Sequence, residues 1–139
     1  MIPLLLLQSA LAAPPPAPIA PEFTEDPQQL IVNLSGDSAK DRVFAARELR
    51  RQARRAVGDL DSRDDLRAAE ARLLLEALDS QAAPACIAAL GSHIAGLCAD
   101  VLAILETTGS LPALHAAAPA TAGVSRRKVE RAITFLESL

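Results

Sequence analysis

The sequence Pro84-Ala-Cys-Ile-Ala-Ala-Leu-Gly91, followed directly by Ser92-His-Ile-Ala-Gly-Leu-Cys-Ala-Asp-Val-Leu-Ala-Ile-Leu105, decides the fold class. It lies in a block, residues 80–125, that contains no lysine or arginine and only two acids, Asp100 and Glu106. The apolar residues recur at helical spacings of three and four and do not alternate as they would in a strand. Gly91 separates the two runs, so we expect a short helix, a tight turn and a longer helix. A helix pair so poor in charge needs other helices to cover it.

The composition also favours an all-α fold. The chain has 139 residues, of which 50% are apolar and only 2% are aromatic. A chain of this length forms at most one domain, and its many alanines and leucines suit closely packed helices better than a β-sandwich core. The formal net charge of −3 is too small to indicate a polyanionic partner or a membrane surface.

Residues 1–12 have the pattern of a signal peptide. An apolar run, Ile2-Pro-Leu-Leu-Leu-Leu7, precedes the small-residue site Ala10-Leu11-Ala12, so we expect cleavage before Ala13 and a periplasmic or secreted protein. The run is too short to span a membrane. No basic residue precedes it, which leaves a cytoplasmic location open if the segment is not a signal. Residues 13–26, rich in proline, are expected to form an extended spacer.

The folded domain is expected to cover residues 27–139, and two of its helix starts carry capping signatures. Ser38 precedes Asp41, and Ser62 precedes Asp65, at the spacing of a capping box. The first signature opens a helix that runs to about Val57. The second opens a helix whose buried stripe we expect at Leu66, Ala69, Leu73, Leu74, Ala77 and Leu78.

Glycines and prolines mark the other helix boundaries. A short helix over residues 27–34 precedes Gly36, and Gly109 is expected to close the second helix of the uncharged hairpin. Another short helix starts at Leu111-Pro112, because proline is tolerated in the first turn. The last helix starts at Ser125, and its expected buried residues are Val129, Ala132, Ile133 and Leu136. The total is six or seven helices.

Three places share one pattern of a short helix, a small break and a longer helix with small residues near its middle. They begin at Leu30, Pro84 and Leu111. The pattern resembles the HEAT-repeat family, in particular the short repeats of phycobilisome-lyase-like proteins, with the closest match at Asp37…Asp41-Arg42…Ala45-Ala46…Leu49. The helix around residue 73 has no counterpart in the other units. The resemblance implies a short α-solenoid that holds a partner protein on one face.

Charge is distributed unevenly between two neighbouring helices. Basic residues predominate from 37 to 57 and acidic residues from 58 to 80, which favours pairing across a shared flank. The basic helix carries an arginine row formed by Arg47, Arg50, Arg51, Arg54 and Arg55. This row could bind nucleic-acid phosphates. The acidic neighbour helix, the negative net charge, the predicted export and the lack of tyrosine or tryptophan argue against nucleic acid as a partner.

The chain contains only two cysteines, Cys86 and Cys98. If their helices form an antiparallel hairpin about Gly91, both lie near the turn, and an oxidising compartment would permit a disulfide that closes a loop of about 13 residues and contributes about 3 kcal/mol. Free core cysteines are the alternative, and the sequence leaves this open. A metal site with His93 would lack a fourth ligand, so we expect none.

We expect no catalytic residues and no cofactor. Ser92, His93 and Asp100 carry a suggestive set of side chains, but no nucleophile elbow, oxyanion-hole turn or glycine-rich phosphate loop accompanies them. His93 is expected near the start of its helix, and His115 on a solvent-facing flank.

The last helix offers the best candidate contact surface. It opens with Arg126-Arg127-Lys128, where positive charge opposes the helix dipole, and its apolar stripe, including Leu136, has no following helix to cover it. We therefore expect a partner protein, or a second copy of the chain, to pack here. The predicted function is a non-enzymatic protein-binding scaffold or adaptor. The alternatives are an intracellular module that contacts nucleic acid through the arginine row and an accessory subunit of an enzyme.

Overall fold

The structure, a computed structural model, describes residues 24–139, and this part of the chain is all-α. It contains seven α-helices, four short 3-10 helices and no strand. The α-helices are α2 (Pro27–Asn33), α3 (Ala39–Asp59), α4 (Asp65–Leu78), α5 (Ala83–Ala88), α6 (Ala95–Ile104), α7 (Leu111–Ala117) and α8 (Gly123–Glu137). The predicted all-α fold of six or seven helices is confirmed for this region.

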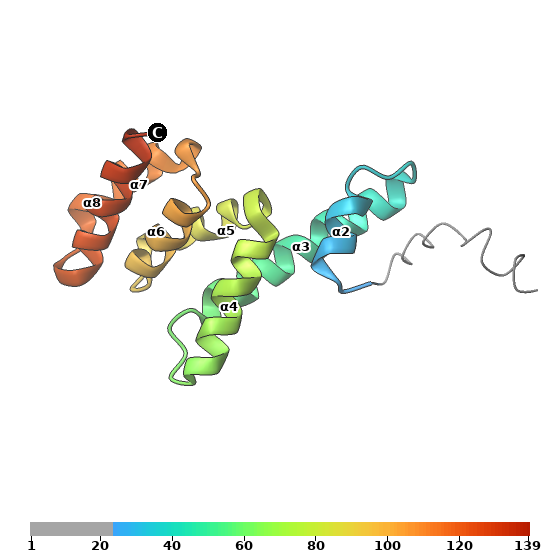
Figure 1. The fold of residues 1–139 in the computed structure, drawn as a ribbon, viewed down its shortest axis with the longest axis horizontal. Helices are drawn as coiled ribbons and strands as arrows, with labels where there is room; N and C mark the ends of the chain where they lie inside the picture. The colour runs from blue at the N-terminus through green and yellow to red at the C-terminus, as the bar shows by residue number, and fades with distance from the viewer. Residues whose placement is uncertain (1–23) are drawn as a thin grey trace, which may run out of the picture.

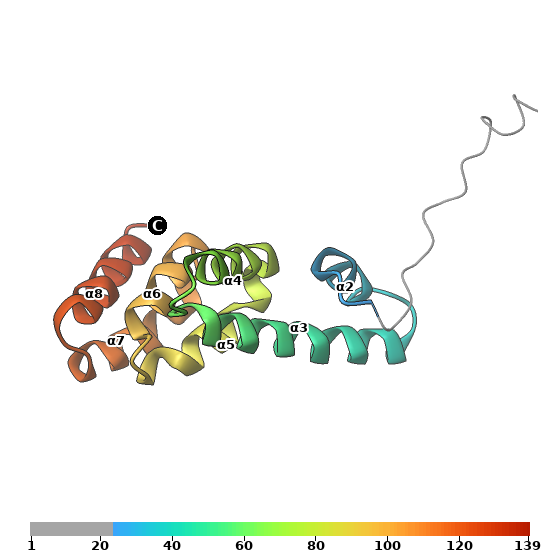
Figure 2. The ribbon, with the colours of Figure 1, turned by 90° about the horizontal axis from the view of Figure 1, so that it is seen from below.

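The helices form an elongated array with two layers (Figures 1 and 2). Figure 2 shows α2, α4, α6 and α8 on one side and α3, α5 and α7 on the other. The long helix α3 runs lengthwise along the array from α2 to α5 (Figure 2), so it connects α2 with the rest of the helices. The most extensive helix–helix contact is between α6 and α8, followed by those of α3 with α4 and with α2.

One core of leucines and alanines runs through the array. Each of Leu30, Leu49, Leu75, Leu102 and Leu114 is fully buried, and together they come from five different helices. Small residues between them allow the helix backbones to approach closely. The small buried residues include Ala45, Ala53, Ala56, Ala95, Ala99 and Ala132.

The capping prediction is confirmed for α3 and corrected for α4. The Ser38 hydroxyl accepts from the Asp41 amide at 3.3 Å, as an N-cap should. At α4 the N-cap is Asp64, whose carboxylate accepts from the amides of Leu66 and Arg67. Ser62 instead accepts from the Asp64 amide and shapes the loop before the helix. A carboxylate at this position also complements the helix dipole.

The predicted buried stripe of α4 is confirmed at Leu78 and is wrong in phase at its other positions. Leu66 and Leu73 are 68% and 64% exposed, and Ala69 and Ala77 are exposed as well. The buried residues are Ala71, Leu75 and Leu78. Leu74 is half-buried. Leu73, Leu74 and Leu75 are consecutive, so the leucine pattern fits more than one rotation of the helix, and packing against α3 selects the face that contains Leu75.

The uncharged hairpin folds as α5 and α6, but α6 ends earlier than predicted. Its C-terminus is a Schellman motif in which the Thr107 amide donates to the Leu102 carbonyl and the Glu106 amide to that of Ala103. Glu106 adopts a positive φ of 53°, in the position that glycine usually occupies. Gly109 lies beyond the helix, in the 3-10 turn Thr108–Ser110.

The apolar stripe of α8 is covered rather than open. Val129, Ala132 and Leu136 are almost completely buried, because this face of the helix packs on α6 and α7. The expectation of an uncovered stripe at Leu136 is therefore corrected: α8 uses its apolar face to join the array. The exposed apolar residues of α8 are Val124 and Phe135.

The predicted signal, residues 1–12, lies outside the described residues, as do all but the last three residues of the predicted spacer, 13–26. The predicted domain start coincides with the first residue of α2, Pro27. No individual helix within 24–139 has both the length and the apolar character needed to cross a membrane. The bent pair Asp65–Gln81 and Ala83–Gly91 reaches that criterion by length and composition only.

Candidate functional site

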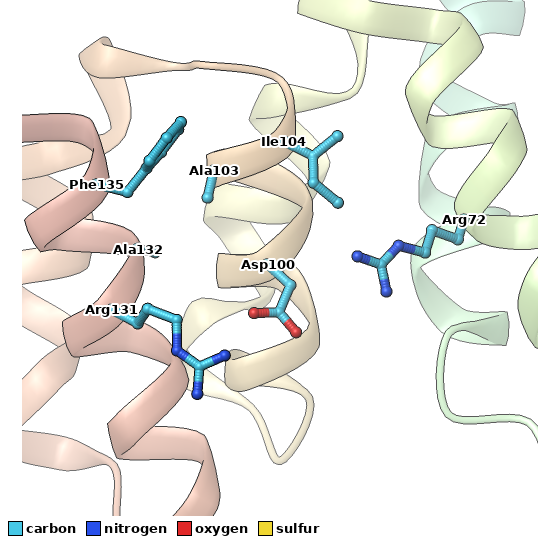
Figure 3. Close-up of a pocket in the computed structure, with 7 residues that line it drawn as sticks. All are labelled: Arg72, Asp100, Ala103, Ile104, Arg131, Ala132 and Phe135. Carbon is cyan, nitrogen blue, oxygen red and sulfur yellow. The ribbon is translucent and has the colours of Figure 1, made fainter. Parts of the chain in front are cut away.

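A groove lies between α4, α6 and α8, with a volume of about 410 Å³. Figure 3 shows the residues that line it. They are Arg72 from α4, Asp100, Ala103 and Ile104 from α6, and Arg131, Ala132 and Phe135 from α8. We call this set the α4–α6–α8 groove.

One end of the groove is apolar. Ile104 and Phe135 are 46% and 42% exposed and stand on either side of Ala103 (Figure 3). Ala103 and Ala132 are small, so they leave space between the larger side chains. Half-exposed aliphatic and aromatic groups at the mouth of a hollow are typical of sites that bury a side chain of another molecule.

The other end of the groove is charged. Figure 3 shows the guanidinium groups of Arg72 and Arg131 on opposite sides of the Asp100 carboxylate. Lys128 holds Asp100 through an ion pair of 3.1 Å between Nζ and Oδ2. Arg72 is 3.8 Å from Glu76 on its own helix, and Arg131 forms no ion pair with any residue in 24–139. The Asp100 charge is thus already balanced, and a guanidinium remains available to a carboxylate from outside.

The predicted basic cluster at the start of α8 is divided in the structure. Lys128 is turned into the α6–α8 contact, where it pairs with Asp100 and lies beside Gly96. Arg126 pairs with Glu130 one turn along the helix, at 3.0 Å. Arg127 is exposed and has no ion-pair partner among the described residues. The predicted contact surface therefore keeps Arg126 and Arg127, while Lys128 and the buried Leu136 belong to the packing of α8 on α6 and α7.

The two cysteines are fully buried and face each other across the α5–α6 hairpin. The side-chain hydrogen bond with Cys86, together with burial, raises the pKa of Cys98 well above its ordinary value. The same hydrogen bond lowers the pKa of Cys86 against the opposing effect of burial. Both thiols are free in the structure.

His93 and Asp100, the histidine and acid of the catalytic set considered above, do not contact each other. His93 hydrogen-bonds to Asp61 through Nε2 at 2.7 Å, while Asp100 pairs with Lys128. His115 hydrogen-bonds to Glu137 of α8 at 2.8 Å, and both residues are exposed. Within residues 24–139, no three His, Cys, Asp or Glu side chains lie close enough together to hold a metal ion.

The arginine row of α3 faces solvent along its whole length. Arg51 binds the Glu48 carboxylate with two hydrogen bonds, which lower the pKa of that carboxyl below its ordinary value. We expected the basic residues of α3 to pair with acids of α4. The ion pair between the two helices instead joins a basic residue of α4, Arg67, to an acid of α3, Asp59, at 3.3 Å. The row thus remains a basic surface of its own.

Comparison with protein-family models, with curated proteins and with solved structures gives no match to this chain. The assignment of function therefore rests on the residues themselves.

Five residues of the groove were not singled out from the sequence: Arg72, Ala103, Ile104, Arg131 and Phe135. Arg131 and Phe135 are four residues apart, which places both on one face of α8. That spacing could have predicted an exposed face of α8 with one charged and one apolar side chain. It could not predict that Arg72 of α4 lies opposite this face.

Proposed function

We propose that this protein is a non-enzymatic binding scaffold and that the α4–α6–α8 groove is where it holds a partner protein. The groove carries the proposal, because it combines half-exposed apolar side chains with an unpaired arginine in one hollow. Protein-binding surfaces are typically enriched in aromatic residues and arginine and contain such a mixture of apolar centre and charged rim.

The two-layered order of the helices supports a HEAT-like α-solenoid as the architecture of this scaffold. In such an array each helix pair buries its apolar face against the next pair, and the surface of one layer forms a binding face. The succession of α4, α6 and α8 in one layer fits this description. Helix α4 would be the extra element, because the sequence pattern gives the helix around residue 73 no counterpart in the other units.

A second candidate function follows from the arginine row of α3. Five arginines lie on one exposed face without acids from α4 to neutralise them. A nucleic-acid backbone would be attracted to such a row, and its binding would weaken steeply with salt. The predicted export of the protein favours the scaffold, since a periplasmic or secreted protein rarely meets nucleic acid. An accessory role beside an enzyme is compatible with either surface.

Site-specific photo-crosslinking in the native host tests the proposed function. Ile104 in the groove and Val43 on α3 are matched, because they are 46% and 50% exposed. Each is replaced in turn by a photoreactive phenylalanine. We expect covalent adducts with a partner protein from position 104 and none from position 43. Adducts from neither position, or from position 43 alone, would remove the groove as the binding site.

A further inference from the structure

We propose that the occupant of the α4–α6–α8 groove is a short acidic amphipathic helix of the partner. This inference rests on the proposed function of the groove, and it specifies the chemistry of what the groove holds. Three properties of the groove carry it: its apolar end, the uncompensated positive charge at its other end, and the fact that its main-chain groups are already hydrogen-bonded within helices.

The apolar end sets one requirement on the occupant. Ile104, Ala103 and Phe135 surround a space that an aliphatic side chain can fill, since the alanine leaves room between the two larger groups. Covering Ile104 and Phe135, which are about half exposed in the free protein, removes apolar surface from water. The occupant therefore presents a leucine-like anchor at this end.

The charged end sets the second requirement. The ionisable residues that line the groove are Arg72 from α4, Asp100 from α6 and Arg131 from α8. Glu76 and Lys128 do not line it, but they pair with Arg72 and Asp100, respectively. The two acids each have a basic partner, and Arg131 is left over. A carboxylate of the occupant would be attracted to it, and a guanidinium binds a carboxylate with two parallel hydrogen bonds. A lysine in the same place would be repelled.

The hydrogen bonding of the main chain sets the third requirement. The groove is built from the sides of three helices, whose amides and carbonyls are bonded within each helix. They offer no edge to which an extended strand could add, so the occupant must satisfy its own main chain, as a helix does. A second hollow, of about 270 Å³, shares Arg72 with the groove and continues along α6 to Leu97. Together the two hollows follow α6 for about two helical turns.

The test uses two synthetic helical probes and purified protein. The acidic probe is a fluorescein-labelled peptide of about 14 residues, roughly four turns, with leucines on one face and a glutamate one turn from each leucine. The basic probe has lysine at every glutamate position. Fluorescence anisotropy measures the affinity of each. We expect the acidic probe to bind about tenfold more tightly or better than the basic one.

Variants then locate the binding. Arg131→Glu and, separately, Arg72→Glu should weaken the acidic probe about tenfold, and Arg131→Glu should improve the basic probe. Phe135→Ala should weaken both probes. Arg47→Glu on α3 makes the same charge change on an exposed surface away from the groove and should alter neither affinity. Circular dichroism checks that every variant remains helical.

Other outcomes overturn the inference in distinguishable ways. If both probes bind equally and only Phe135→Ala weakens them, the groove recognises apolar surface without regard to charge. If neither probe binds while position 104 still crosslinks to a partner, the groove binds protein but not an acidic helix, and only the further inference fails. If Arg131→Glu instead dissociates a dimer seen by sedimentation, the occupant is a second copy of this chain, which equally contradicts the acidic partner helix.

Discussion

Gly96 fixes how closely α8 approaches α6, and replacing it with alanine should weaken the fold. A Cβ at this position would lie 3.0 Å from the Ser125 Cα, 3.2 Å from the Lys128 Cδ and 3.3 Å from the Ser125 Oγ. Carbon atoms in favourable contact are about 3.5–4.0 Å apart. The Lys128 side chain can move aside, but Ser125 contributes a backbone atom, so α8 itself must shift.

The expected size of the effect follows from two opposing contributions. Overpacking of this kind costs about 1–3 kcal/mol. Alanine recovers at most about 1 kcal/mol of helix propensity, and less here because Gly96 lies in the first turn of α6. We therefore expect Gly96→Ala to lower the free energy of unfolding by about 1–2 kcal/mol, which corresponds to a fall in Tm of roughly 4 °C per kcal/mol.

Urea unfolding followed by circular dichroism measures the change, and Gly58→Ala provides the control. Gly58 lies in α3, and a Cβ there would meet nothing within 4 Å. Gly58→Ala should therefore leave the stability unchanged or raise it by up to about 0.5 kcal/mol, because Gly58 lies in the last turn of α3. If Gly96→Ala proves as stable as the unmodified protein, or more stable, the close approach of α6 and α8 described above is wrong.

Three further predictions concern a helix end, the buried thiols and the N-terminus. Glu106→Gly should raise the free energy of unfolding by about 0.5–1 kcal/mol, because glycine adopts the positive φ of this Schellman position without strain, whereas Glu106→Ala should give no such gain. The pKa of Cys98 is raised in the folded protein, so above the ordinary thiol value of 9.0 the unfolded chain loses a proton that the folded chain keeps, and stability falls as pH rises. This loss, at most about 1.4 kcal/mol per pH unit, should disappear in the double variant Cys86→Ala, Cys98→Ala. Urea unfolding at several pH values measures it, and a free energy of unfolding that falls equally steeply with pH in both proteins would show that Cys98 is not held protonated. Intact-mass measurement of protein from its native host should show Ala13 as the first residue, and retention of residues 1–12 would exclude the predicted cleavage.

The sequence was sufficient to predict features that depend on local chemistry. The all-helical class follows from the spacing of apolar residues in the hairpin, and the N-cap at Ser38 follows from one hydroxyl at the right distance from its helix. The outward face of α3 was also predictable, because five arginines cannot be buried together without acids.

Features that depend on how helices meet were not predictable in this way. The rotation of α4 is set by its contact with α3, and three consecutive leucines left that rotation open. The role of Lys128 depends on Asp100, which lies on another helix, so Lys128 looked like part of a surface cluster. The groove exists only because α4, α6 and α8 converge, and no single segment contains its apolar and charged ends together.

Chemical-shift mapping by NMR tests most directly whether the groove is the site that binds an acidic helix. The isotope-labelled protein is titrated with the acidic helical probe, and the backbone amides and arginine Nε–H groups are followed. We expect shifts that cluster at Arg72, Ile104, Arg131 and Phe135 and leave the arginine row of α3 unchanged. Shifts confined to the arginine row, or the absence of any localised change at saturating peptide, would contradict it.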